Sequence, residues 1–111
     1  MIKTNREALE YVRDVPEPER TAILLEAHQH SPNGEGENAI TPFPHKEGDD
    51  VYARCRKDDE LCLKIGGRDV LLLRSTGIYV LSESKHFSPI NNAYLLYLLN
   101  VRQRKDKIAK I

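Results

Sequence analysis

Four short strand-like segments in the second half of the chain constrain its fold most strongly. They read VYARCR (51–56), ELCLKI (60–65), VLLLRS (70–75) and IYVLSE (78–83). The breaks between them are Lys57-Asp58-Asp59, Gly66-Gly67 and Thr76-Gly77. The last two breaks suit two-residue hairpin turns, in which a glycine adopts a positive φ. The pattern therefore predicts a four-stranded antiparallel β-meander.

The turns also predict the register of this meander. If Ile65 faces Arg68 and Ser75 faces Ile78, ten apolar residues share one face, and a one-residue slip would divide them between both faces. These ten are Val51, Ala53, Cys55, Leu61, Leu63, Ile65, Val70, Leu72, Tyr79 and Leu81. The opposite face carries Arg54 beside Cys62, and then Leu71, Leu73, Ile78 and Val80. The second hairpin is thus apolar on both faces, so something must cover each side.

Two cross-strand pairs of opposite charge support this arrangement. The register places Arg56 opposite Glu60 and Lys64 opposite Asp69. Opposite charges that face each other across antiparallel strands stabilise a sheet.

The first thirty residues predict two short helices. Thr4 and Glu7 have the spacing of a capping box, and an apolar stripe at helical spacing follows them. Pro16 and Pro18 end this helix and open a second one over about 18–29, because proline is tolerated only in the first turn of a helix.

A third helix is predicted at the end of the chain. Ser88-Pro89 has the pattern of an N-cap and a first-turn proline, and seven consecutive apolar residues follow at 93–99. A helix that is apolar all round is expected to be buried all round. One sheet face covers only one side of it, so the N-terminal helices or a second subunit must cover the rest. This need for cover favours a homodimer.

These elements give an α+β fold with two N-terminal helices, a four-stranded antiparallel β-meander and a C-terminal helix packed on the sheet. At 111 residues the chain has the length of one domain. We expect a helical pair over 1–30, a flexible acidic loop over 31–50, and the sheet with its helix over 51–111.

The composition excludes several classes of protein. Lys and Arg number 17, as do Asp and Glu, so the net charge is zero, whereas a dedicated nucleic-acid binder is usually basic. At 40% hydrophobic residues the chain is too apolar for a disordered protein. No apolar run approaches the roughly 18–20 residues of a membrane span, and the first residues lack the apolar core of a signal peptide. We therefore expect a cytoplasmic protein with reduced cysteines and no membrane contact.

The charge is unevenly distributed along the chain. Residues 31–50 carry a local charge of −4, and residues 102–111 carry +4. Such a loop is either a tolerated surface segment or a lid or partner-binding segment, in which Ile40, Phe43 and His45 would make the ordered contacts. The basic tail is either a solvated helix end or a contact for an acidic partner or a nucleic acid. A nucleic-acid contact would use Arg54 with Arg102, Arg104, Lys105 and Lys107, although the tail lacks interleaved aromatic residues.

Known catalytic and cofactor motifs are absent from the sequence. There is no GxSxG elbow, HExxH helix, CxxC pair or phosphate-binding loop. His28 and His30 would point to different sides of a helix, so they do not predict a metal site with His45 and a cysteine. Cys62 is expected to be a buried structural residue. We expect no metal and no cofactor.

One acidic grouping offers an alternative. Asp69 begins a strand, and Glu83-Ser84-Lys85 follows the next strand of the same hairpin. Two acids and a lysine can hold a divalent cation and orient an attacking water. Over about 17 residues this grouping resembles the D…ExK pattern of restriction-endonuclease-like nucleases, which implies a metal-dependent nuclease with Asp69, Glu83 and Lys85 in its site. In the predicted register a bulge would be needed to bring the three together.

The leading hypothesis is a small, non-catalytic binding or regulatory protein that acts through protein–protein contacts and self-associates. Its partner would be an unidentified protein or a second copy of the chain. The expected contact residues are Tyr94, Tyr97, Leu98 and Val101 on the last helix, with Ile40 and Phe43 in the loop. The alternative is a nucleic-acid-binding module or the nuclease.

Overall fold

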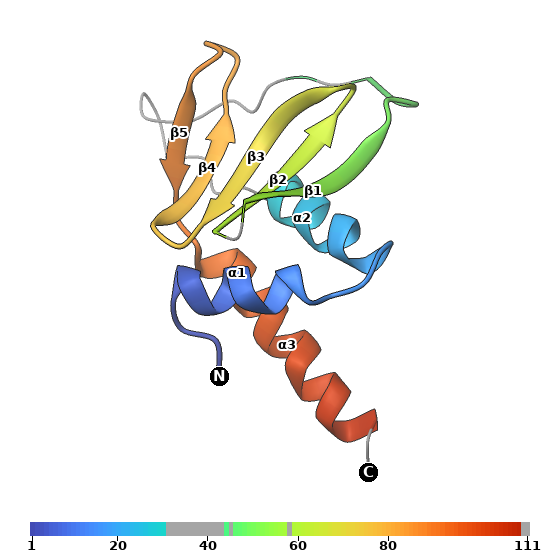
Figure 1. Ribbon diagram of the computed structural model, residues 1–111, viewed down its shortest axis with the longest axis vertical. Helices are drawn as coiled ribbons and strands as arrows, with labels where there is room; N and C mark the ends of the chain where they lie inside the picture. Colours follow the sequence, from blue (N-terminus) through green and yellow to red (C-terminus); the bar gives the residue numbers. More distant parts are fainter. Residues whose placement is uncertain (31–43, 45, 58, 110–111) are drawn as a thin grey trace.

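The computed structural model has the predicted α+β architecture, with one strand more than expected (Figure 1). It describes residues 1–30, 44, 46–57 and 59–109, and for 107–109 the backbone alone. Most of the predicted acidic loop, including Ile40, Phe43 and His45, lies outside these residues. The helices are α1 (Asn5–Arg13), α2 (Glu19–Gln29) and α3 (Ala93–Ala109), and the strands are β1 (Val51–Lys57), β2 (Glu60–Ile65), β3 (Arg68–Arg74), β4 (Gly77–Leu81) and β5 (Phe87–Ile90). The five strands form one antiparallel sheet in the order β1-β2-β3-β4-β5.

The two N-terminal helices begin as the sequence predicts. The Glu7 amide donates to the Thr4 hydroxyl at 3.1 Å, and this hydroxyl donates to the Glu7 carboxylate at 3.1 Å. The capping box is therefore present at the start of α1. Helix α2 covers the predicted range to within one residue.

The β1–β2 hairpin has the predicted register as far as Cys55, after which Lys57, and not Arg56 as predicted, pairs with Glu60. The register also changes between β2 and β3. Val51 pairs with Ile65, Arg54 pairs with Cys62, and Lys64 pairs with Asp69. Beyond Lys64 the ladder slips by one residue at Val70, so Leu63 pairs with Leu71 instead. Such a bulge exchanges the two faces of the strand that follows it.

Val70 is buried in the core as predicted, but the bulge makes the predicted apolar face wrong for the rest of β3 and for β4. The face that packs against the helices carries Leu61, Leu63, Leu71, Leu73, Ile78 and Val80. Leu72, Tyr79 and Leu81 lie on the opposite face with Cys62. The pattern could not reveal the exchange, because this hairpin is apolar on both faces.

The second hairpin turn is also displaced from its predicted place. Arg74 pairs with Gly77, so the turn consists of Ser75 and Thr76 rather than Thr76 and Gly77. The pairing differs from the prediction by two residues. A shift of two keeps every side chain on its face, so the hydrophobic pattern does not distinguish the two registers.

Ser88-Pro89 does not cap a helix, which corrects the sequence prediction. Both residues lie in β5, where Ser88 pairs with Val80 and Pro89 pairs with Tyr79. An edge strand tolerates proline because one side of its backbone has no neighbouring strand. Helix α3 begins later, where the Asn91 side chain accepts the Ala93 amide proton at 2.6 Å.

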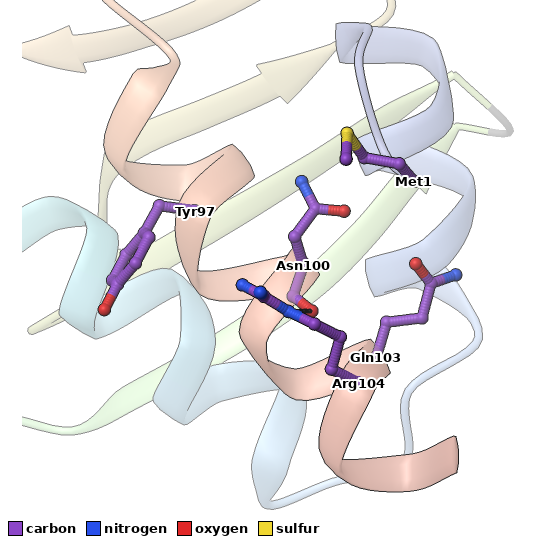
Figure 2. A pocket seen from close by; sticks show the side chains of 5 residues that line it. All are labelled: Met1, Tyr97, Asn100, Gln103 and Arg104. Carbon is purple, nitrogen blue, oxygen red and sulfur yellow. Dashed lines mark hydrogen bonds between the residues drawn. The ribbon is translucent and has the colours of Figure 1, made fainter. Parts of the chain in front are cut away.

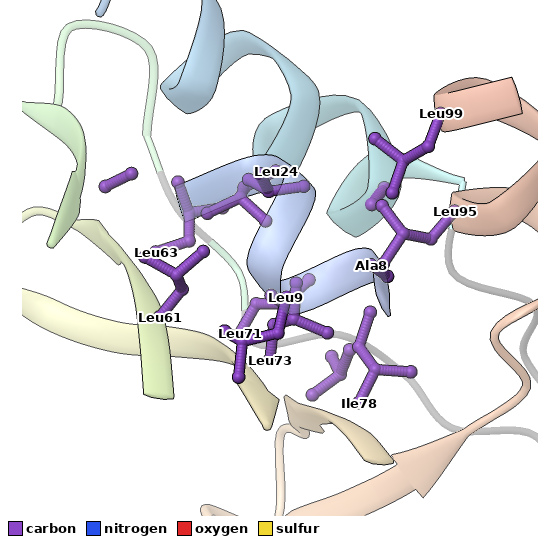
Figure 3. Close-up of a cluster of buried hydrophobic side chains, with 14 of the residues drawn as sticks. Ala8, Leu9, Leu24, Leu61, Leu63, Leu71, Leu73, Ile78, Leu95 and Leu99 are labelled. Carbon is purple, nitrogen blue, oxygen red and sulfur yellow. The ribbon is translucent and has the colours of Figure 1, made fainter. Parts of the chain in front are cut away.

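One hydrophobic core joins the helices to the sheet (Figure 3). Helices α1 and α2 cover one sheet face, and α3 packs mainly against these two helices and extends away from the sheet (Figure 1). Leu95 and Leu99 carry the contact of α3 with the core, and both are fully buried. Among the described residues, no helix is both long enough and apolar enough to cross a lipid bilayer.

A single side chain ties α3 to the start of the chain. Asn100 accepts the Ile2 amide proton at 2.7 Å and donates to the Ile2 carbonyl at 2.9 Å and to the Leu96 carbonyl at 2.9 Å. Further along α3, the Tyr11 hydroxyl donates to Asp106 at 3.3 Å, and Arg102 pairs with Glu19. These contacts fix the orientation of α3 relative to α1 and α2.

Candidate functional site

The four contact residues predicted on the last helix share one side of α3. Tyr94, Tyr97, Leu98 and Val101 have the i, i+3, i+4, i+7 spacing of a single helix face. We call these four residues the α3 outer stripe. Leu95 and Leu99 point into the core, whereas Tyr97 is 61% exposed and the other three residues are half-buried. The expectation that this helix is buried all round is therefore wrong for one side of it in the single chain.

Hollows border the outer stripe on both sides. The first, of about 360 Å³, lies between α3 and the start of the chain and is lined by Met1, Tyr97, Asn100, Gln103 and Arg104 (Figure 2). The second, of about 300 Å³, lies between α2 and α3. Its lining residues are Ile23, Glu26, Leu98, Val101, Arg102 and Lys105. The apolar residues of the outer stripe thus lie beside charged side chains, Glu26 near one end of the stripe and Arg104 and Lys105 near the other.

Tyr94 is held in place by Glu26 of α2 and by His30, which directly follows this helix. Its ring stacks on His30 with centroids 4.7 Å apart, and its hydroxyl donates to the Glu26 carboxylate at 3.0 Å. The pKa of Tyr94 is raised, and the largest cause is that its surroundings desolvate the phenolate. The Glu26 carboxylate raises it further, because it accepts a hydrogen bond from the neutral hydroxyl and repels the charge of the phenolate. The hydroxyl therefore remains a donor at neutral pH. Tyr97 lies next along the stripe, 6.3 Å from the Tyr94 ring.

The basic residues of the tail have different surroundings. Arg102 pairs with Glu19, and this contact raises the pKa of the guanidinium. Arg104 and Lys105 are exposed beyond the end of the outer stripe, and the Arg104 side chain donates to the Asn100 carbonyl at 3.3 Å. The side chain of Lys107 lies outside the described residues. The three tail cations with described side chains, Arg102, Arg104 and Lys105, therefore do not form one uniform patch.

Asp69 is engaged by cations, whereas Glu83 and Lys85 lie in the turn between β4 and β5. The Asp69 carboxylate contacts Lys64 at 2.7 Å and Arg56 at 3.0 Å. Burial opposes ionisation of Asp69, but hydrogen bonds from Lys64 and Cys62 and the charges of Lys64 and Arg56 outweigh it, so its pKa is lowered. Glu83 and Lys85 are exposed. In the described part of the chain, no three His, Cys, Asp or Glu side chains come close enough to hold a metal ion.

The predicted cross-strand ion pairs are confirmed within a larger network. Arg56 contacts Glu60 at 3.5 Å, and Lys64 contacts Asp69 as expected. Two further pairs were not predicted. Arg56 contacts Asp69 at 3.0 Å, and Arg74 contacts Glu60 at 2.5 Å because the bulge at Val70 shifts Arg74 to face Glu60. Glu26 and His30 beside the outer stripe were not predicted either. Their i, i+4 spacing at the end of α2 was the available signal, but nothing local showed which helix they face.

The two cysteines lie on opposite faces of the sheet, as the predicted register implied, but Cys55, which was expected on the buried apolar face, is exposed. Cys62 is fully buried, and Cys55 is exposed beside the irregularity of β1. Burial, and then the neighbouring Asp69 carboxylate, raise the pKa of the Cys62 thiol to about 12. A thiol with such a pKa is a poor nucleophile, which agrees with a structural role.

Comparison with protein-family models, with curated proteins and with solved structures finds no match to this chain.

Proposed function

We propose that this protein is a non-catalytic binding protein that acts in the cytoplasm and self-associates through the α3 outer stripe. The observation that carries the proposal is the stripe itself, because two tyrosines, a leucine and a valine lie on one helix face that the chain leaves partly uncovered. Tyrosine is enriched in protein–protein interfaces, since it has a large apolar surface and a polar end. An apolar stripe at this spacing is the surface that a second helix covers in a helical pair.

Charge favours a second copy in an antiparallel orientation. Glu26 lies at the Tyr94 end of the stripe, and Arg104 and Lys105 lie at the other end. A two-fold axis between Leu98 and Val101 would place Leu98 against Val101 of the second copy. It would also bring Lys105 close to Glu26 of that copy. A parallel arrangement would instead place like charges together, which is unfavourable.

Sedimentation velocity at increasing protein concentration tests self-association. We expect a monomer–dimer equilibrium that Tyr97→Glu shifts to monomer, because the contact would bury the new carboxylate without a partner. Tyr52→Glu is the matched control, since Tyr52 is also an exposed tyrosine but lies on the sheet. A strict monomer up to roughly 100 µM, which is well inside the micromolar to millimolar range of weak complexes, would overturn the proposal.

A charge exchange tests the antiparallel geometry. Lys105→Glu and Glu26→Lys should each weaken the dimer, and the double variant should restore much of the lost affinity, because the opposite charges would again face each other. Failure of the double variant to recover affinity would exclude this orientation. Thermal melts of each variant show whether the monomer is still folded.

A further inference from the structure

The second face of the sheet carries an arrangement that the proposed self-association does not use. Helices α1 and α2 pack against the other face, through the core residues of β1 to β4. By strand register, the second face carries Tyr52 and Arg54 from β1, Lys64 from β2, Arg74 from β3, Tyr79 from β4 and Phe87 from β5. We call these six residues, together with Arg56, whose guanidinium pairs with Glu60 and Asp69, the open sheet face. Cys62, Leu72 and Leu81 lie among them on the same face and are buried.

Positive charge dominates the open sheet face. Glu60 contacts Arg56 and Arg74, and Asp69 contacts Arg56 and Lys64, so three cations share two carboxylates. Arg54 adds a fourth cation, which is exposed and forms no ion pair within the described part of the chain. Four cations against two carboxylates leave a net charge of +2.

Glu60 lies below the two arginines that it contacts. The Glu60 side chain is only 6% exposed, whereas the side chains of Arg56 and Arg74 are 43% and 44% exposed. The Glu60 carboxylate therefore holds these two guanidinium groups in position, and they face the solvent. Asp69 is 26% exposed and its partner Lys64 only 17%, so this lysine is the less accessible cation. The zero net charge of the whole chain does not reveal this local excess.

Exposed aromatic rings flank these cations. Tyr52 is 42% exposed on β1, and Phe87 is 39% exposed on β5. Between them, the Arg74 guanidinium lies over the Tyr79 ring at 5.6 Å from its centroid. Five strands about 4.8 Å apart place the two outer strands roughly 19 Å from each other, so Tyr52 and Phe87 lie at opposite edges of this face.

We propose that the open sheet face binds single-stranded nucleic acid. Arginine and lysine side chains neutralise phosphates, and aromatic rings stack on unpaired bases of any sequence. A sheet surface with these two groups presents unpaired bases to the rings, whereas a duplex requires an element that enters a groove. An acidic peptide would use the cations but would leave the rings without stacking partners. The basic tail of α3 lacks aromatic residues among its cations, and its Arg102 is paired with Glu19.

Fluorescence anisotropy with a labelled 12-nucleotide oligouridine, titrated with the full chain at 50 mM salt, tests this proposal. We expect saturable binding that Tyr52→Ala weakens about tenfold, through the loss of one stacked base. Arg54→Glu should weaken it at least as much. Arg6→Glu on α1 is the matched control, because it reverses an exposed arginine outside the open sheet face and should change the affinity little.

Salt provides a second readout. Contact with two phosphates of a single strand predicts a slope of about −1.4 in log affinity against log salt, or a roughly sevenfold loss between 50 and 200 mM. An absence of binding, or equal losses in the Arg54 and Arg6 variants, would overturn the proposal. So would equal affinity for a DNA duplex, or a poly-glutamate peptide that binds as tightly as the oligouridine, which would identify an acidic protein instead. None of these outcomes bears on self-association through α3, which Tyr97→Glu tests separately.

Discussion

At the scale of single residues, burial makes the Cys62 thiol unreactive. Its thiol is buried beside Asp69, and its pKa of about 12 leaves about one thiolate in 10⁴ at pH 8. We expect a disulfide reagent such as Ellman's reagent to modify one thiol of the folded protein, Cys55, and both thiols in urea. Cys55→Ser should abolish the reaction of the folded chain. Rapid modification of two thiols without denaturant would contradict this burial.

Asp69 predicts a specific dependence of stability on pH. Its folded-state pKa is lowered, so the folded protein binds this proton more weakly than the unfolded chain does. The ionised carboxylate therefore stabilises the fold above the unfolded pKa of about 4, and this contribution is lost as the pH falls through the folded value. Urea denaturation should show a gap between wild type and Asp69→Asn that is largest near neutral pH and narrows below about pH 4.

An exposed aspartate provides the control for this experiment. Asp14 lies at the end of α1 and its side chain is exposed, so Asp14→Asn should give a much smaller gap. A gap for Asp69→Asn that is the same from pH 3 to pH 7 would show that its ion pairs with Lys64 and Arg56 do not stabilise the fold.

At the scale of elements, the turn between β2 and β3 depends on backbone conformation. Gly67 has a φ of +80°, and a methyl group added there would meet no atom within 4 Å. Gly67→Ala should therefore lower the free energy of unfolding by about 1–2 kcal/mol through backbone strain alone. Gly67→Asn should cost less, because asparagine tolerates this conformation. Equal losses for the two variants in urea denaturation would show that strain is not the cause.

The elements that could be predicted from the sequence are those with a local physical cause. The Thr4–Glu7 cap and the turn at Gly66-Gly67 are each determined by a few adjacent residues. The bulge at Val70 could not be predicted, because both faces of this hairpin are apolar and either register buries leucines. Ser88-Pro89 fits the start of a helix and an edge strand equally well. These residues form a strand because β4 has a free edge with which they pair.

The same distinction applies to the candidate sites. The spacing of Tyr94, Tyr97, Leu98 and Val101 was sufficient to place them on one helix face. Their neighbours Glu26 and His30 come from another helix, and only the packing of α2 against α3 brings them together. The open sheet face depends in turn on the bulge, because only the slip at Val70 brings Arg74 opposite Glu60.

At the scale of the whole molecule, the strand order has a consequence for how the chain folds. Every strand pairs with its neighbour in the sequence, so the sheet closes only short loops. The contact of Ile2 with Asn100 instead joins residues 98 positions apart. Closing a long loop costs more chain entropy than closing a short one, and such contacts slow folding when they must form early.

We therefore expect the sheet to form before the two ends of the chain meet. Asn100→Ala should cost about 1–3 kcal/mol, because it leaves buried backbone groups of Ile2 without partners. In stopped-flow experiments the loss should appear as faster unfolding at an unchanged folding rate. Gln103→Ala, three residues along α3, is the control. The hydrogen bonds between Ile2 and Asn100 would then be the last part of the molecule to form and the first to open.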